Sequence, residues 1–189
     1  MASTNELLSQ LTNFECYYSD GQRFLGMVDI ELPELKFMTA EIQGAGVTGK
    51  IEMPTQGHTE PLELTINFRN VSDDVSKLSE QKAIDLSFYG AQHVYNYRDA
   101  RTIARRIKID IRGFIKNTPL GSFKVSELTE TKVTFELIYI KVEIDGTEYW
   151  YIDKLNYIFR VNRVDYLSDT RRALGLDTTL GDVIQAVLS

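Results

Sequence analysis

Residues 132–161 read KVTFELIYIKVEIDGTEYWYIDKLNYIFRV, and this stretch decides the fold. At its centre, Asp145-Gly146 favours a tight type I′ turn, because both central positions of that turn need positive φ. Long runs rich in β-branched and aromatic residues flank the pair on both sides. The stretch therefore predicts a long β-hairpin that turns at Asp145 and Gly146.

The first arm of this hairpin changes its apolar face part-way along. Because side chains alternate along a strand, one face is apolar at first and the opposite face later. The first set is Val133, Phe135, Leu137 and Tyr139, and the second is Ile138, Ile140, Val142 and Ile144. One explanation is a β-bulge between Leu137 and Ile140 that re-phases the strand within one core. The other is that half of the arm packs against a neighbouring molecule, and the pattern alone leaves both open.

The composition is that of an ordinary globular protein. The chain has 189 residues, 43% hydrophobic and 25% charged, which suits one well-packed domain over residues 1–189. Ten Tyr and nine Phe against four Pro favour a β-rich fold. The single Cys16 excludes an internal disulfide, and no apolar run approaches the ~20 residues of a membrane helix. We expect a soluble protein made in the cytoplasm, without membrane anchoring.

The rest of the pattern predicts one antiparallel β domain with little helix. A capping box at Ser3 and Glu6 predicts an N-terminal helical arm over residues 1–12. A short mid-chain helix is expected to begin after Ser72, and a C-terminal helical extension over residues 177–189. Strands are expected at 14–18, 24–32, 62–68, 84–89 and 104–114.

Charge is unevenly distributed along this acidic chain. Residues 98–116 carry seven basic residues against two acidic ones, although the whole chain has a net charge of −6. Such a segment suits contact with an acidic partner surface or with nucleic acid. The simpler interpretation is a solvated face whose charges pair locally.

A glycine-rich loop at residues 44–50 is the one stretch that resembles a nucleotide site. Gly44, Gly46, Gly49 and Lys50 match the phosphate-binding and dinucleotide motifs in part. Both motifs require a helix immediately after the loop, where backbone amides and the helix dipole meet phosphate. Here an extended segment that contains Pro54 follows, so we expect a structural loop and no nucleotide.

The other reactive residues have no neighbours in the sequence that would complete a catalytic or metal site. His58 and His93 have no metal-ligand spacing, and Cys16 has no nucleophile signature. We therefore expect no catalytic residue, no metal and no cofactor. The aromatic run Tyr149-Trp150-Tyr151 suits either hairpin packing or a ligand platform, and the second would make the chain a soluble β-sandwich binding module.

The central stretch resembles the major tail tube proteins of contractile-tailed bacteriophages and phage-tail-like bacteriocins. The matching residues of the C-terminal motif are Asp145, Gly146, Glu148, Ile152, Asp153, Asn156, Ile158, Val161, Asn162, Val164, Asp165, Leu167, Arg171, Arg172, Gly175 and Leu176. Leu32-Pro33-x-Leu35, Gly44-Ala45-Gly46-x-x-Gly49 and Arg112-Gly113 are also similar. The likeness spans roughly residues 14–176, and both ends of the chain depart from it.

This resemblance implies an antiparallel β-sandwich or barrel-like subunit whose long hairpins join between subunits. Six copies would form a ring, and rings would stack into the inner tube of a contractile tail. We then expect contacts between subunits or rings at two places, the glycine loop and the second half of the first arm. Their residues are Gly44, Ala45, Gly46, Gly49, Ile138, Ile140, Val142 and Ile144.

The resemblance also implies partners and a location. They are the tail sheath, baseplate hub, tape measure and tail terminator proteins, with DNA only in transit through a negatively lined bore. The basic segment 98–116 would then face outward toward the sheath. The protein would sit in a virion tail or a similar particle, assembled in the bacterial cytoplasm and released by lysis.

Overall fold

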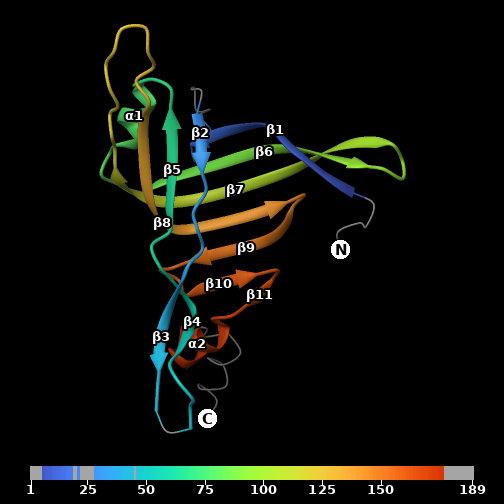
Figure 1. The fold of residues 1–189 in the computed structure, drawn as a ribbon, viewed down its shortest axis with the longest axis vertical. Helices are drawn as coiled ribbons and strands as arrows, with labels where there is room; N and C mark the ends of the chain where they lie inside the picture. The colour runs from blue at the N-terminus through green and yellow to red at the C-terminus, as the bar shows by residue number, and fades with distance from the viewer. Residues whose placement is uncertain (1–5, 19–20, 22–27, 45, 177–189) are drawn as a thin grey trace, which may run out of the picture.

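The computed structural model describes residues 6–18, 21, 28–44 and 46–176, and Figure 1 shows their mainly antiparallel β architecture. These residues form eleven strands and two short helices. The strands are β1 Glu6–Tyr18, β2 Val28–Glu31, β3 Phe37–Ile42, β4 Ile51–Thr59, β5 Glu63–Phe68, β6 Ile84–Asn96, β7 Arg101–Asn117, β8 Thr131–Ile144, β9 Thr147–Asp153, β10 Ile158–Val161 and β11 Val164–Asp165. The helices are α1 Asp73–Leu78 and α2 Ser168–Ala173.

Two sheets account for all of these strands. The large sheet runs in the order β1-β6-β7-β8-β9-β10-β11, and β5 also pairs with β8 and carries β2 on its other side. The small sheet is the β3–β4 hairpin. The expected fold class, mainly antiparallel β with a short mid-chain helix, is confirmed. The large sheet does not close into a barrel within the described part of one chain.

The central hairpin is β8 and β9, and its turn is confirmed. Asp145 and Gly146 have φ of 50° and 75°, and they are the only residues between the two strands. The Asp145 side chain also fixes the turn, because its Oδ1 accepts a 2.9 Å hydrogen bond from the Arg106 backbone N–H. The Asp145 backbone N–H donates in return to the Arg106 carbonyl at 2.9 Å.

A β-bulge lies where the apolar face of the first arm changes. Along the β7–β8 pair, Gly113 lies opposite Leu137 and Arg112 opposite Tyr139, so Ile138 is the extra residue. Leu137 and Ile140 both stay in the same core, with exposed fractions of 0% and 7%. The re-phasing explanation is therefore confirmed.

The core lies between two parts of the large sheet, one formed by β6 to β10 and the other by β5 and β2, and α1 packs against it (Figure 1). Val75 and Leu78 anchor α1 to it, and α1 begins after Ser72 as the sequence predicts. The most fully buried large side chains are Leu62, Leu64, Ile66, Leu78, Leu86, Val133, Phe135 and Leu137.

The N-terminal helix expected over residues 1–12 is wrong from Glu6 onward, where the chain forms β1; residues 1–5 lie outside the described part. The register of β1 against β6 shifts twice, between Leu8 and Leu11 and between Leu11 and Asn13. Leu8 and Leu11 are three residues apart in the sequence, as on one face of a helix, and the register shifts allow a strand to accommodate this spacing.

Several elements are longer than the sequence predicts or are absent from the prediction. Strand β6 extends to Asn96 and β7 begins at Arg101, because the two pair from Ile84 and Gly113 to Asn96 and Arg101. The extended segment expected around Pro54 is the first part of β4, whereas β3 and α2 have no counterpart among the predicted elements. The predicted C-terminal helix of residues 177–189 lies outside the described residues.

Candidate assembly surfaces

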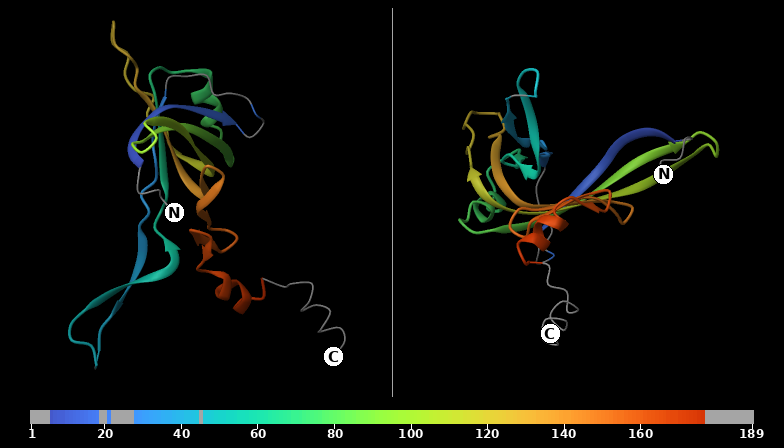
Figure 2. Two further views of the ribbon diagram at one scale, coloured as in Figure 1. Left: turned by 90° about the vertical axis from the view of Figure 1, so that its right-hand side faces the viewer. Right: turned by 90° about the horizontal axis from the view of Figure 1, so that it is seen from below.

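Three segments project from the sandwich (Figure 2). One is the β3–β4 hairpin and another is the three-stranded ribbon made by the ends of β1, β6 and β7. The third is the knob loop, residues 118–130, which connects β7 to β8 without helix or strand. The hairpin and the knob loop point in opposite directions along the longest axis of the molecule (Figure 1).

The β3–β4 hairpin exposes both of its faces. Every residue of β3 is exposed, and so are the first six of β4. The exposed large apolar side chains are Phe37, Met38, Ile42, Ile51 and Met53. A two-stranded hairpin without a covered face is marginally stable in water, so this segment lacks a partner surface within its own described chain.

The tip of this hairpin carries the predicted glycine contacts. Gly44, Gly46 and Gly49 have φ of 153°, 97° and 107°, and a Cβ built on any of them meets nothing within 4 Å. Ala45 lies outside the described residues. Lys50 leads directly into β4, so the loop lacks the helix that both phosphate motifs require. The open side of these glycines leaves room for another chain.

The base of the hairpin, in contrast, is fixed to the body. The rings of Phe37 and Phe159 pack edge to face with centroids 5.7 Å apart. Gly57 of β4 has φ of 72° and lies against Leu167, so closely that a Cβ at Gly57 would be 2.5 Å from Leu167 Cγ. The base of the hairpin is therefore held against the body by packing contacts, and the rest of the hairpin projects from it.

The predicted contacts on β8 divide into two kinds. Ile138, Val142 and Ile144 are partly buried, which leaves some of each side chain accessible to a neighbour. Ile140 is a core residue that packs beside Ile152, its partner on β9. Its burial argues against an interface role for Ile140, which stays a prediction.

The face of the large sheet that points away from the core is polar. One row crosses seven strands and consists of Tyr17, Ser87, Asp110, Lys141, Tyr151, Arg160 and Asp165. Lys108 Nζ lies 2.7 Å from Asp110 Oδ2, and the Arg160 guanidinium lies 4.3 Å above the Tyr151 ring. Charges of both signs pair along this face, so neither sign dominates the row.

The basic segment 98–116 is mostly neutralised by its own neighbours. Arg105 pairs with Asp145 at 3.1 Å and Arg112 with Asp85 at 2.6 Å, while Lys116 pairs with Glu63. Neighbouring side chains also raise the pKa of Lys108, chiefly through the hydrogen bond to Asp110. Local pairing, the simpler interpretation, therefore describes residues 105–116.

The residues of the C-terminal motif build its turns. Asp153 Oδ1 accepts the backbone N–H groups of Leu155 and Asn156, and Oδ2 accepts the Asn156 side-chain amide at 2.7 Å. Asn162 and Arg163 supply the two positive φ values of the turn between β10 and β11. This motif is structural.

A second part of the motif clamps α2. Arg171 donates to the Tyr157 carbonyl at 2.8 Å and to Asp165 Oδ2 at 2.8 Å, while Arg172 pairs with Asp169 at 3.0 Å. Burial acts to raise the pKa of Asp165, but the hydrogen bonds from Arg171 and the Leu167 N–H outweigh it, so this pKa lies below its usual value. The ionised carboxylate is thus stabilised by folding.

The remaining candidates have structural positions. Tyr149 is the extra residue where β9 pairs with β8, and its ring lies 6.1 Å from that of Trp150, with the two planes 38° apart. The Tyr151 ring packs edge to face against Tyr139 of β8 at 5.4 Å, as expected for hairpin packing. Burial raises the pKa of the Cys16 thiol to about 12, which keeps it protonated. No group of three or more His, Cys, Asp or Glu side chains in the described residues could hold a metal ion. None of the described helices is long and apolar enough to span a membrane.

Sequence reasoning missed the knob loop as a surface. Phe123 and Val125 there are 91% and 96% exposed, the highest values among the exposed large hydrophobic residues. A phenylalanine and a valine within a segment that has no strand alternation and follows the Pro119 turn would have been the signal.

The family model described as phage tail tube protein FII matches residues 9–175. The chain belongs to this family. A curated relative, the tail tube protein of Escherichia phage P2, is 26% identical over 164 residues, which cover 84% of this chain and 93% of the relative. The resemblance found in the sequence is thereby confirmed, and the chain is a phage-type tail tube protein.

Two solved structures of an extracellular contractile injection system are also similar to this tail tube protein. A chain of the sheath–tube complex in its extended state has a TM-score of 0.46 and 14% identity, covering 69% of this chain and 87% of that one. A chain of the sheath/tube terminator in the extended state gives 0.48 and 14%, covering 71% and 96%.

Proposed function

We propose that this tail tube protein is a structural, non-catalytic subunit that closes into six-membered rings, which stack into the inner tube of a contractile tail. The observation that carries the proposal is the β3–β4 hairpin, which exposes five large apolar side chains on two open faces. A second copy is the partner that membership of the family favours. The hairpin and the knob loop project in opposite directions, which suits head-to-tail stacking along one axis (Figure 1).

The polar face of the large sheet is the surface we propose for the bore. Its paired charges leave little net attraction for phosphate, since DNA binding rises with the number of free cations that replace counterions. DNA would then pass without being held. The surrounding sheath, the baseplate hub, the tape measure and the terminator proteins are partners in the same proposal, and a virion tail or phage-tail-like particle released by lysis is its location.

Assembly of the purified chain tests this function. Electron microscopy over a rising concentration series should show rings and then tubes, with six subunits in each ring. A charged hairpin variant, Ile51→Lys with Met53→Lys, should remain monomeric with an unchanged unfolding midpoint, because neither side chain is buried in one chain. Val164→Lys with Leu174→Lys is the matched control at two exposed apolar positions outside the hairpin, and it should assemble normally. A wild-type chain that stays monomeric at every concentration would mean that the chain is a self-contained module.

A further inference from the structure

Among the described residues, the apolar core is open at one side. Where the ribbon leaves the body, an apolar groove of about 150 Å³ lies between β1, β2, β6 and β7. It is lined by Leu11, Phe14, Ile30, Leu32, Phe88, Gly90, Ile107 and Ile109. Every lining residue is apolar, so water in this groove finds no side-chain hydrogen-bond partner there.

The size of the groove suits one aromatic ring. An engineered apolar cavity of about 150 Å³ lined by Leu, Ile and Phe binds benzene. Among the aromatic residues of the described chain with large exposure, Phe123 is the most exposed, at 91%. Its ring has the same size and chemistry as that ligand.

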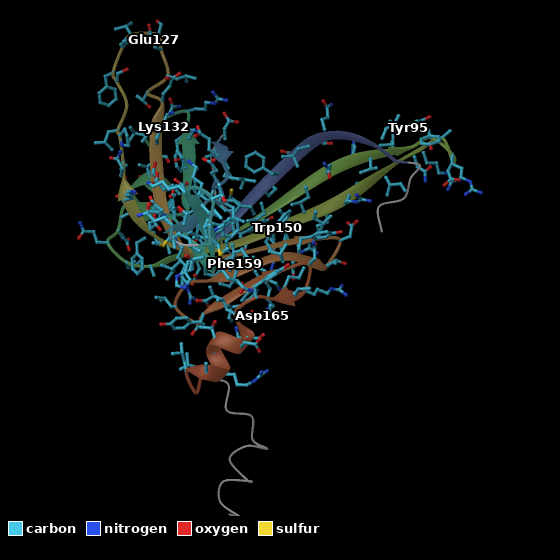
Figure 3. The ribbon with its side chains drawn as sticks, turned by 60° about the horizontal axis from the view of Figure 1, so that its bottom comes forward. Tyr95, Glu127, Lys132, Trp150, Phe159 and Asp165 are labelled. Atoms are coloured by element: carbon cyan, nitrogen blue, oxygen red, sulfur yellow. The ribbon has the colours of Figure 1, made fainter. Side chains whose placement is uncertain are left out.

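The knob loop presents Phe123 from a fixed base. Ser122 N–H donates to the Thr129 carbonyl at 3.0 Å, and Lys132 N–H donates to the Pro119 carbonyl at 3.0 Å. The Thr131 hydroxyl donates to the Leu120 carbonyl at 3.0 Å. These bonds close the base of the loop and leave residues 123–128 projecting, as the position of Glu127 shows in Figure 3.

The charged groups next to the two surfaces already have partners within one chain. Glu31 accepts a 2.8 Å hydrogen bond from the Asn67 side chain, and the Arg106 guanidinium lies 4.9 Å from the centroid of the Tyr89 ring. Lys124 and Glu127 of the knob loop pair with each other at 3.1 Å. In the described part of the chain, no charged side chain lines the groove, so a contact between these surfaces depends on apolar fit.

We infer that Phe123 of one copy inserts into the apolar groove of a second copy. Figure 3 places the knob loop, at Glu127, and the ribbon, at Tyr95, on opposite sides of the body. The two surfaces differ, so their contact is head-to-tail and continues from copy to copy. This inference deepens the proposed function and rests on it, because it names the contact through which assembly proceeds.

Disulfide trapping tests the contact directly. Phe123→Cys with Leu32→Cys in one chain should give a ladder of covalent oligomers under oxidising conditions. An equimolar mixture of the two single variants should give dimers and nothing larger. Wild type, which retains only the buried Cys16, is the background. Phe123→Cys with Leu155→Cys, at an exposed turn residue away from the groove, is the matched control and should stay at background.

A truncation gives a second, independent measurement. Phe123→Ala should raise the concentration at which half the protein is assembled by at least about tenfold, as expected for a central aromatic contact. Its unfolding midpoint as a monomer should not change, because the side chain is exposed there. Leu155→Ala should change neither quantity.

The outcomes separate this inference from the proposed function. A wild-type chain that never assembles removes the proposed function. Normal assembly of wild type without linking between residues 123 and 32 overturns only the inference, as does normal assembly of Phe123→Ala. Efficient linking of Ile51→Cys to Leu32→Cys in place of the knob loop would also overturn it, because the groove would then hold the β3–β4 hairpin.

Discussion

Gly57 and Leu167 meet so closely that no side chain fits between them. A Cβ added to Gly57 would lie 2.5 Å from both Cγ and Cδ2 of Leu167, and Gly57 has φ of 72°. This contact joins the β3–β4 hairpin to the segment that leads into α2. It therefore sets where the exposed hairpin starts.

Gly57→Ala should destabilise the monomer by about 2–4 kcal/mol, because it adds steric overlap to the cost of a positive φ. The free energy of unfolding from denaturant titration measures the change. Gly175→Ala is the matched control, since Gly175 has φ of 71° with nothing within 4 Å of the added Cβ. It should cost only the backbone term of about 1–2 kcal/mol. Equal losses in the two variants would show that Leu167 moves aside freely.

Gly146→Val should impair folding or assembly, because a β-branched residue resists the φ of 75° that the β8–β9 turn requires. No neighbour lies within 4 Å of the added Cβ, so the effect comes from the backbone alone. Tube yield and the unfolding midpoint measure it. A wild-type yield of stable tubes would contradict the role of this turn.

Ile140→Asp should unfold the monomer, since it places a carboxylate in the core at a position that is 7% exposed. The expected loss is about 4 kcal/mol or more. Circular dichroism of the dilute, unassembled protein is the measurement. Val164→Asp, at an exposed apolar residue, should change stability by less than about 0.5 kcal/mol. A folded Ile140→Asp monomer that fails only to assemble would restore the interface role.

Asp165→Asn should lower the free energy of unfolding, and the size of this loss should depend on pH. The pKa of Asp165 is lowered in the folded state, so its ionised form contributes stability above the unfolded value of about 3.9. That contribution is lost as pH falls through the lower folded pKa. We expect the variant to be less stable by about 1–2 kcal/mol at pH 7, with the difference shrinking in acid.

Unfolding titrations between pH 7 and pH 2 measure this difference. Asp169→Asn is the control, because the Asp169 side chain is 89% exposed and pairs only with a residue one turn away. It should follow wild type at every pH. A constant gap between wild type and Asp165→Asn would mean that Arg171 does not hold an ionised partner.

The local patterns that the sequence predicts well are those that a single chain completes. The Asp145-Gly146 turn and the start of α1 after Ser72 each satisfy their requirements nearby in the sequence. Strand β5 was predicted because its residues alternate between buried and less buried positions. The leucines of β1 were misassigned because their spacing follows bulges in the pairing with β6. That pairing links residues about 80 positions apart, which no local pattern reports.

The candidate site was only partly predictable for a related reason. The glycine loop was found because Gly44, Gly46 and Gly49 are conspicuous, but the exposure of the strands beside it was not. Strand β3 shows no alternation between buried and exposed residues. When the apolar side chains of a strand do not pack against the core of their own subunit, the strand need not alternate between apolar and polar residues. For Ile140, the sequence pattern shows that the apolar face of the strand changes but does not show why.

Because the β3–β4 hairpin is exposed in one chain, we expect its stability to depend on the concentration of the protein. In the proposed assembly, its apolar strands gain cover from other copies, so that part of the structure is completed only above a threshold concentration of the protein. Below that threshold, the same strands remain open to unwanted partners. A cell that makes this protein thus has reason to produce it in a concentrated burst, so that correct association outruns aggregation.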